Sequence, residues 1–149
     1  MQMTNECPSF SINEDEILIN DLANPIIDPK YEKKTYEFVF EQQKNKNCFR
    51  GVKEVKKAIR KNHKGLVILS ADTNPFDVIS AFPVTCEQKE LKYYYIRSKR
   101  LLSKAAGTKL TAAVVMIPEP ENKEQLSKYK KLVEKADEMA QKQEKVIIY

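Results

Sequence analysis

The residues best suited to chemistry lie between Arg50 and Lys61, where cationic side chains recur at helical spacing. At about 100° per residue, Lys53, Lys57 and Arg60 project from nearly the opposite side of a helix to its apolar residues, which are Val52, Val55 and Ile59. Glu54 stands at the edge of this cationic stripe. Cationic side chains bind phosphate oxygens, and a carboxylate can accept a hydrogen bond from a base edge. The spacing therefore predicts a helix that holds a phosphate backbone and tests a base.

A simpler interpretation of this helix also fits its periodicity. Lysines on one side of an amphipathic helix commonly form only its solvated face. An acid in the first turn, such as Glu54, is favoured by the helix dipole without any ligand. From the spacing alone the solvated face is the leading interpretation, so the rest of the chain must decide.

Charge is distributed unevenly along the chain. The 149 residues carry a net charge of +5, yet residues 1–29 contain six acids and no lysine or arginine. The remaining 120 residues therefore carry +11. A basic body behind an acidic leader indicates a polyanionic partner, and nucleic acid is the commonest one.

The sequence lacks the usual patterns of catalytic and metal-binding residues. Its three cysteines show no C-x-x-C spacing, and its one histidine, His63, precedes Gly65 in a turn where we expect it to be exposed. Asp72 has no acid or base partner nearby and is expected to brace its loop. Cys86 is expected to be a small buried group. We therefore predict no catalytic residue, no metal site and no cofactor, and so a protein that is not an enzyme.

Neither a membrane-spanning segment nor a secretory signal is visible in the sequence. No apolar run approaches the roughly 20 residues that a membrane helix needs. The first residues lack the basic and apolar regions of a signal peptide. An odd number of cysteines without paired spacing indicates a reducing compartment and no disulfide framework. We expect no membrane partner.

The first half of the chain predicts two helices and two strands. A helix is expected over residues 31–44, because Tyr31, Thr35, Phe38 and Val39 share one face. A short strand at residues 46–50 and the helix after Gly51 follow. Residues 66–69 are continuously apolar, as in a strand covered on both faces. Upstream, residues 24–29 contain two prolines and are expected to lie extended along the body.

The second half continues the alternation. Asn74 before Pro75 is a typical helix start, which predicts a helix from residue 75 to 82 that breaks at Pro83 and resumes to about residue 89. A strand at 93–96 precedes a helix that Ser98 caps and Gly107 ends. Another buried strand is expected at 111–117. In residues 121–140 apolar side chains recur at 3-4 spacing, typical of a helix packed on a sheet.

This order predicts an α/β protein, a three-layer α/β/α sandwich with a central mixed sheet of about four strands. Residues 22–143 would form one domain that includes the last helix. Residues 1–21 are expected to be an acidic, unpacked tail, and residues 144–149 a short apolar tail. Tyr93, Tyr94 and Tyr95 have rings that could stack on bases. Because side chains alternate along a strand, we expect at least one or two of them in the core.

Six segments of the chain, in matching order, resemble the kink-turn-binding superfamily of ribosomal and small nucleolar proteins. The resemblance covers roughly residues 22–140. It implies an RNA-binding function. For the helix after Gly51, it therefore favours RNA contact over a merely solvated cationic face. The matching segments are Arg50–Val55, Lys64–Val67, Ala71–Pro75, Pro83–Glu87, Tyr95–Lys99 and Ala105–Lys109.

Lys53 is the discriminating position within this superfamily. Members that read kink-turns tightly carry Gly-x-Asn-Glu, whereas Gly51 is followed here by Val52, Lys53 and Glu54, as in the eukaryotic H/ACA branch. Asparagine offers a donor and an acceptor in one plane, while lysine offers three donors on a flexible stem. The lysine therefore predicts weaker motif selectivity and a stronger salt dependence of RNA binding.

The resemblance extends the RNA-binding surface beyond this helix. Many relatives place a basic residue and a proline after the loop lysine, but Lys109 is followed here by Leu110 and Thr111, so this loop could differ in backbone and offer an apolar contact. A cap role alone would explain Asn74. The predicted RNA-binding residues are Arg50, Gly51, Lys53, Glu54, Lys57, Arg60, Lys61, Asn74, Val78, Lys99, Thr108, Lys109 and Leu110.

Resemblance to the H/ACA branch implies a non-catalytic core subunit of the nucleolar particle that guides RNA pseudouridylation and supports ribosome biogenesis. The implied partners are an H/ACA-type guide RNA with an irregular stem-loop, a small scaffold subunit and the pseudouridine synthase subunit, with this chain as a monomer within the complex. Two alternatives stay open. One is a kink-turn subunit of box C/D or spliceosomal particles, against which Lys53 argues. The other is a protein-interaction module that uses the helix seam at Tyr129 or residues 146–149.

Overall fold

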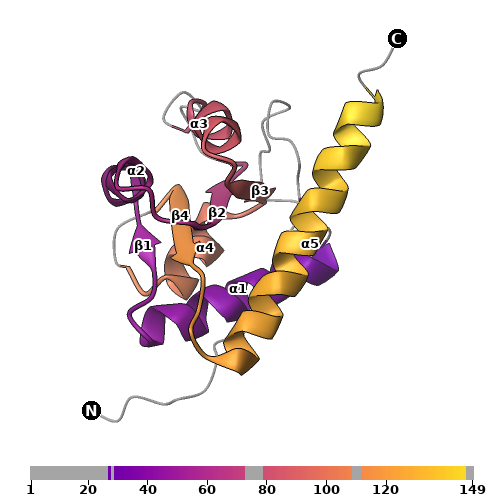
Figure 1. Ribbon diagram of the computed structural model, residues 1–149. Coiled ribbons are helices and arrows are strands. Elements are labelled where there is room, and N and C mark those ends of the chain that lie inside the picture. Colours follow the sequence, from indigo (N-terminus) through magenta and orange to yellow (C-terminus); the bar gives the residue numbers. More distant parts are fainter. Residues whose placement is uncertain (1–26, 28, 73–78, 109–111, 147–149) are drawn as a thin grey trace, which may run out of the picture.

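The computed structural model describes residue 27 and residues 29–72, 79–108 and 112–146 (Figure 1). Along these residues the chain begins with helix α1 (Pro29–Lys44), strand β1 (Phe49–Arg50), helix α2 (Val52–Arg60) and strand β2 (Gly65–Ser70). It continues with α3 (Phe82–Gln88), β3 (Lys92–Ile96), α4 (Lys99–Ala105), β4 (Val114–Pro118) and α5 (Lys123–Val146). This order of helices and strands is the predicted one.

The four strands form one mixed sheet in the order β1-β4-β2-β3. Strands β2 and β3 are parallel, and β4 runs antiparallel to both of its neighbours, β1 and β2. All six residues of β2 are buried, as expected for a central strand that is apolar on both faces. β1 lies at one edge of the sheet, directly before α2.

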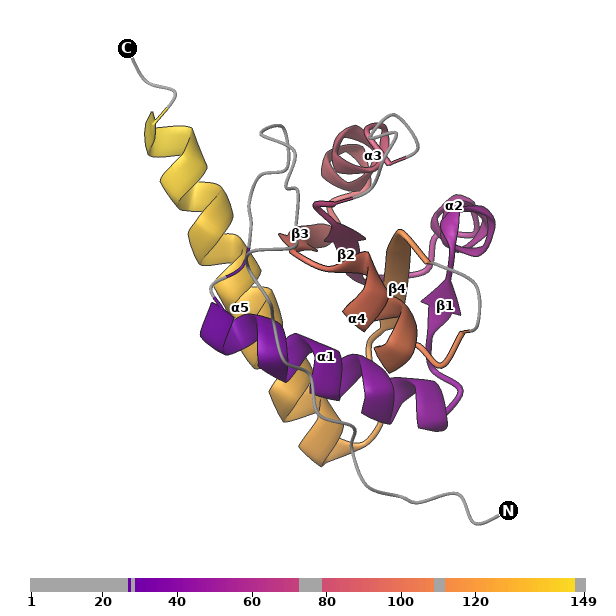
Figure 2. The same cartoon turned by 180° about the vertical axis from the view of Figure 1, so that it is seen from behind.

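Helices cover both faces of the sheet, with α1, α4 and α5 on one side and α2 and α3 on the other (Figures 1 and 2). Successive side chains of a strand point to opposite faces of the sheet, so each strand contributes to the core on both sides. In β2, Leu66 and Ile68 pack toward α1, α4 and α5. Val67 and Leu69 pack toward α2 and α3. Each such side chain contributes about 1.5–3 kcal/mol on burial. The predicted three-layer sandwich is confirmed.

The tyrosines of β3 serve the core rather than a ligand surface. Tyr94 is fully buried and shares a 2.8 Å hydrogen bond with the Thr35 hydroxyl of α1. Tyr95 is buried on the other face, and burial raises its pKa to about 12. Tyr93 is half-buried and donates a hydrogen bond to Glu87 at 3.2 Å. Core packing for at least two of the three is therefore confirmed.

The edge of the sheet formed by β3 is covered from outside. Ile27 is fully buried, and its N–H donates to the Tyr95 carbonyl at 3.0 Å. On the same side, Lys92 of β3 forms an ion pair with Asp137 of α5. The other residues of the predicted extended segment before α1, 24–26 and 28, lie outside the described residues.

The start of α3 differs from the prediction. Residues 79–81 form a turn, and the helix begins at Phe82 with Pro83 in its first turn. A helix through residue 82 that breaks at Pro83 is therefore wrong for these residues, because a proline in the first turn has no intrahelical N–H bond to lose and favours a helix start. Residues 75–78 lie outside the described residues.

Three further boundaries differ. β1 is confined to Phe49–Arg50, because Lys46 takes a left-handed φ of 57° and turns the chain after α1. β4 begins at Val114 rather than near residue 111, since the N–H of Ala112 donates to the Ser103 hydroxyl instead of joining the sheet. α5 continues to Val146, so residues 144–146 are helical rather than part of a tail.

Candidate nucleic-acid interface

Four of the segments predicted to contact RNA meet at one end of the sheet. Strands β1, β2 and β3 end there and β4 begins there, because the register pairs Arg50 with Val115, Leu69 with Val114 and Ser70 with Ile96. Gly51 and Asp72 follow the ends of β1 and β2, and Lys99 follows the end of β3, so these three residues lie at this end of the sheet. Along the chain, Thr108 lies between α4 and β4.

Gly51 sets the direction in which α2 leaves the sheet. Its φ of 88° and ψ of 161° lie in a region that is essentially open only to glycine. Its N–H donates to the Val114 carbonyl at 2.9 Å, and its carbonyl accepts the N–H of Val55 at 3.1 Å. A Cβ at this position would meet no atom within 4 Å. Glycine is therefore required by the backbone rather than by lack of space.

Arg50 and Glu54 brace the turn into α2. Glu54 reaches back over the first turn, and its Oε2 accepts the N–H of Arg50 at 2.9 Å, much as in a capping box. The guanidinium of Arg50 donates through Nη1 to the Ala106 carbonyl, 2.9 Å away at the end of α4. These bonds tie β1, α2 and α4 together. The predicted RNA contacts of the two side chains stay predictions.

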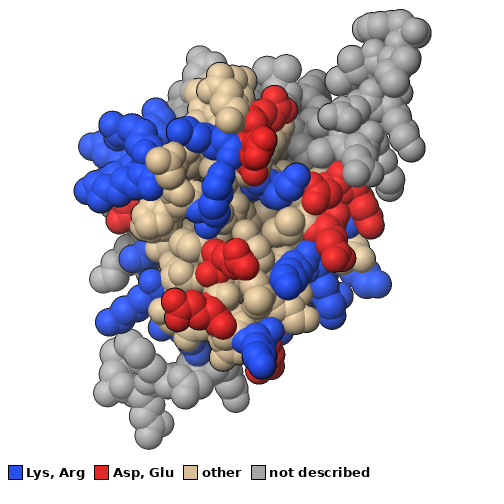
Figure 3. Space-filling model, viewed as in Figure 1, with Lys and Arg blue, Asp and Glu red and all other residues tan. Residues whose placement is uncertain are grey.

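The two faces of α2 are as predicted. Val55, Ala58 and Ile59 are buried against the sheet. The cations of the opposite side are exposed, and Figure 3 shows Lys and Arg side chains gathered over α2. An exposed cation loses little solvation until a ligand arrives, so this face can bind phosphates with little prior rearrangement. The exposed cations of this helix and its C-cap are Lys53, Lys56, Lys57, Arg60 and Lys61.

Asp72 fixes the start of α4 beside the end of β2. Its Oδ1 accepts the N–H of Lys99 at 2.9 Å, and partial burial raises its pKa above the ordinary value. Ser98 caps the same helix, since its hydroxyl accepts the N–H of Leu101 at 3.3 Å. The loop-bracing role predicted for Asp72 and the cap predicted for Ser98 are confirmed. Both hold Lys99 at this end of the sheet.

The other end of α4 closes with Gly107. Its φ of 68° is left-handed, and a Cβ there would lie 2.8 Å from the side chain of Gln43. Thr108 follows and donates its N–H to the Ser103 carbonyl at 3.2 Å. The structure thus places Thr108 near Arg50, whose guanidinium meets the same end of α4. Four predicted contact residues lie outside the described residues: Asn74, Val78, Lys109 and Leu110.

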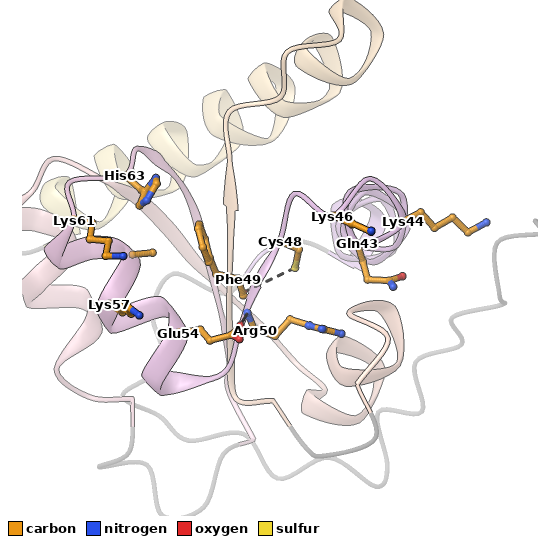
Figure 4. Close-up of a pocket in the computed structure, with 11 residues that line it drawn as sticks. Gln43, Lys44, Lys46, Cys48, Phe49, Arg50, Glu54, Lys57, Lys61 and His63 are labelled. Atoms are coloured by element: carbon orange, nitrogen blue, oxygen red, sulfur yellow. Dashed lines mark hydrogen bonds between the residues drawn. The ribbon is translucent and has the colours of Figure 1, made fainter.

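A groove of about 940 Å³ along β1 was not foreseen from the sequence. It lies between the end of α1 and α2, and Figure 4 shows Lys57 and Lys61 extending into it from α2. His63 is exposed, as predicted, and its ring lies 5.3 Å from that of Phe49. A sequence signal for the groove is the pair of lysines at residues 44 and 46, which lie at the end of the first predicted helix and just after it.

The described residues form neither a metal-binding cluster nor a membrane-spanning helix. They contain no group of three or more His, Cys, Asp and Glu side chains placed to hold a metal ion. None of the described helices is long and apolar enough to cross a membrane. Burial raises the pKa of both Cys48 and Cys86 to about 12, which keeps these thiols protonated near neutral pH. Cys86 is fully buried, as predicted.

Comparison with known proteins agrees with this fold. Residues 33–127 match the Ribosomal protein L7Ae/L30e/S12e/Gadd45 family, and the chain belongs to that family. The resemblance drawn from the sequence motifs is therefore confirmed.

Individual relatives narrow the comparison. The chain is similar to the H/ACA ribonucleoprotein complex subunit 2-like protein of Xenopus tropicalis, with 42% identity over 112 residues, which are 75% of each chain. It is also 38% identical over 111 residues to the H/ACA ribonucleoprotein complex subunit 2 of Bos taurus, covering 74% of this chain and 72% of that one. Among solved structures, the Giardia lamblia 15.5kD RNA binding protein matches 81% of this chain and 99% of its own, with a TM-score of 0.75 and 23% identity, which shows the shared fold.

Proposed function

We propose that this chain is a non-catalytic RNA-binding core subunit of an H/ACA ribonucleoprotein, which supports guide-RNA-directed pseudouridylation of ribosomal RNA and ribosome biogenesis. The observation that carries the proposal is the exposed cationic face of α2, which Gly51 orients at the end of the sheet where β3 also leads into Lys99. Relatives that match about three quarters of the chain bear the name of an H/ACA subunit, which supports the choice of particle.

In and next to α2, some residues are proposed to contact phosphates, and others hold the helix in position. Lys53, Lys57 and Lys61 recur at i, i+4 spacing and form one row of ammonium groups for phosphate oxygens. The bonds of Glu54 to Arg50 and of Arg50 to Ala106 hold that row at a constant angle to the sheet. Residues 74, 78, 109 and 110 are also proposed to contact RNA, on the resemblance alone, and they lie outside the described residues.

We infer that the specificity for RNA is shared with the partner subunits. Lys53 has no acceptor, so it cannot check a base edge as an asparagine would. The chain then recognises an irregular stem-loop mainly by shape and charge. A small scaffold subunit and the pseudouridine synthase subunit supply the remaining selectivity, with one copy of this chain in each complex and the particle in the nucleolus.

A kink-turn subunit of box C/D or spliceosomal particles is the alternative RNA-binding function. The likeness to the 15.5kD protein extends to the fold alone, and Lys53 in place of asparagine argues against it. A protein-interaction module built on the α5 seam has less support. Leu132 and Ala136 of that helix are buried in the core, and Tyr129 packs on Phe38 with ring centroids 6.5 Å apart. The apolar side of α5 is thus already packed against the rest of the domain.

The proposal is tested by titrating the purified chain with an H/ACA stem-loop RNA at several salt concentrations. Lys53→Gln with Lys57→Gln is expected to weaken binding and to lower the salt slope by about 1.5, roughly 0.7–0.9 for each lost phosphate contact. Lys30→Gln with Lys33→Gln is the matched control, because these exposed lysines lie at the start of α1 and remove the same charge. Equal affinity and slope in all three proteins would refute the proposal.

A further inference from the structure

The groove along β1 begins at the proposed RNA surface and leads away from it. Arg50 and Glu54 at its start belong to that surface, and Lys57 and Lys61 form its wall on α2. The opposite wall comes from the end of α1, where Gln43 and Lys46 lie (Figure 4). β1 is an edge strand, so no further strand of the sheet fills this space.

The floor of the groove is apolar and aromatic. Phe49, Cys48 and Ala58 line it, and the half-buried Phe49 ring meets the exposed His63 ring at an interplanar angle of 51°. Such a floor offers two ring faces or edges to an incoming planar group. Proteins bind single-stranded nucleic acid by combining a cationic groove for the backbone with aromatic side chains on which bases stack.

The charge of the walls selects an anion. Five of the lining residues are lysine or arginine, and Glu54 is the one acid among them. Its Oε2 already accepts the N–H of Arg50, which places part of its charge against the backbone. Lys46 stands across the groove from Lys57 and Lys61, whereas the side chain of Lys44 extends away from the groove (Figure 4). The Lys44 ammonium lies 4.6 Å from the centroid of the Phe40 ring.

We propose that this groove binds a single-stranded RNA segment that flanks the stem-loop held by α2. Its phosphates contact Lys46 on one wall and Lys57 or Lys61 on the other, and one unpaired base packs against Phe49 and His63. The inference rests on the proposed RNA-binding function and adds a second contact region to it. Lys57 and Lys61 are one helical turn apart, so a strand leaving the exposed face of α2 enters the groove without a break.

An extended protein strand fits this place less well. β1 has two residues, and the N–H of Arg50 is already used by Glu54, so little backbone is left for pairing. Paired RNA fits less well too, because its bases are stacked on one another and cannot reach an aromatic floor. Cationic walls with a ring floor match an unpaired strand on both counts.

The test compares one stem-loop RNA with and without a single-stranded flank of about 6 nucleotides. The flank is expected to tighten binding to the unmodified chain about tenfold. Lys46→Asn should remove much of that gain and lower the salt slope for the flanked RNA by about 0.7. Asparagine tolerates the left-handed φ of 57° at this position, so the turn after α1 is kept. Phe49→Leu keeps an apolar side chain and should reduce the flank's gain with the salt slope unchanged.

Binding of the stem-loop without the flank should be the same in all these proteins. Lys33→Gln, at the far end of α1, is the single-charge control and should keep the full gain. If the stem-loop binds but the flank adds nothing, the inference fails while the proposed function stands. If the stem-loop itself does not bind, both fail. If Lys46→Asn abolishes binding of the scaffold subunit and spares the flank's gain, the groove is a protein site and the inference is wrong.

Discussion

Gly51 gives the sharpest prediction about how the fold sets the RNA surface. Its φ and ψ, 88° and 161°, are open to glycine and strained for any residue with a Cβ. We expect Gly51→Ala to lower the free energy of unfolding by about 1–3 kcal/mol. A Cβ there would meet no atom within 4 Å, so collision with neighbours adds nothing to that cost. The whole effect is backbone strain, or the loss of the turn if the strain is relieved.

The two ways of accommodating the alanine have different consequences. If the backbone keeps its geometry, stability falls and RNA affinity does not. If the turn relaxes, the N–H bond from Gly51 to the Val114 carbonyl breaks, the start of α2 shifts, and RNA affinity falls as well. Urea unfolding measures the first quantity and titration with a stem-loop RNA the second. For a chain of this size the thermal midpoint should drop by about 3–10 °C.

Two other glycines serve as internal controls. Gly107 has a left-handed φ of 68°, and its Cβ would meet only the flexible end of Gln43, so Gly107→Ala should cost less, about 1 kcal/mol. Gly65 has no positive φ, but its Cβ would lie 2.4 Å from the Ile117 carbonyl oxygen, so its alanine variant should fail through a clash between strands. A Gly51→Ala protein as stable as the unmodified chain, or less affected than Gly107→Ala, would refute the reasoning.

Three further outcomes are expected. Lys53→Asn should lower the salt slope of RNA binding by about 0.7–0.9. It should also sharpen discrimination between a kink-turn RNA and a control RNA in which the sheared base pair of the kink-turn is replaced. Both RNAs are titrated at several salt concentrations, and an unchanged slope would mean that Lys53 contacts no phosphate. Burial raises the pKa of Asp72, so the folded chain takes up a proton on this carboxylate at a higher pH than the unfolded chain does. The stability of the unmodified chain relative to Asp72→Asn should therefore be greatest below about pH 3.9 and should fall as pH rises through the raised pKa. Urea unfolding that gives the same difference in free energy between the two proteins at every pH would contradict this. In a Cys7→Ser protein, Cys48 and Cys86, each with a pKa of about 12, should resist iodoacetamide at pH 8 until the chain unfolds, and rapid labelling of the folded protein would count against it.

The features that the sequence predicts well are those with a strong local period. The apolar side of α2 follows from the spacing of Val52, Val55 and Ile59, and it is buried as expected, with Val52 half-buried at its start. Residues 66–69 are apolar at every position, which identifies a strand between two helix layers. The alternation of such segments is enough to predict the three-layer sandwich.

Boundaries are harder because they depend on non-local contacts. Pro83 fits either the end of one helix or the first turn of another, and only the turn at residues 79–81 decides between them. Likewise, the short β1 reflects its pairing with β4 and the left-handed turn at Lys46, neither of which has a local signature.

The predicted RNA contacts stay predictions, and the structure adds roles in the fold for two of the residues. Glu54 and Arg50 were expected to touch RNA, whereas their described bonds brace the fold, one of them to a carbonyl 56 residues away. The groove between α1 and α2 could not be predicted, because its walls come from segments that the sheet alone brings together.

We propose that this chain holds H/ACA guide RNA through the cationic face of α2. Crosslinking the chain to RNA in cells and sequencing the bound RNA tests it most directly, with a Lys53→Glu, Lys57→Glu protein as the comparison. H/ACA RNAs should be recovered with the unmodified chain, and these crosslinks should be lost in the variant. Recovery of box C/D or spliceosomal RNAs in their place, or equal recovery by both proteins, would contradict it.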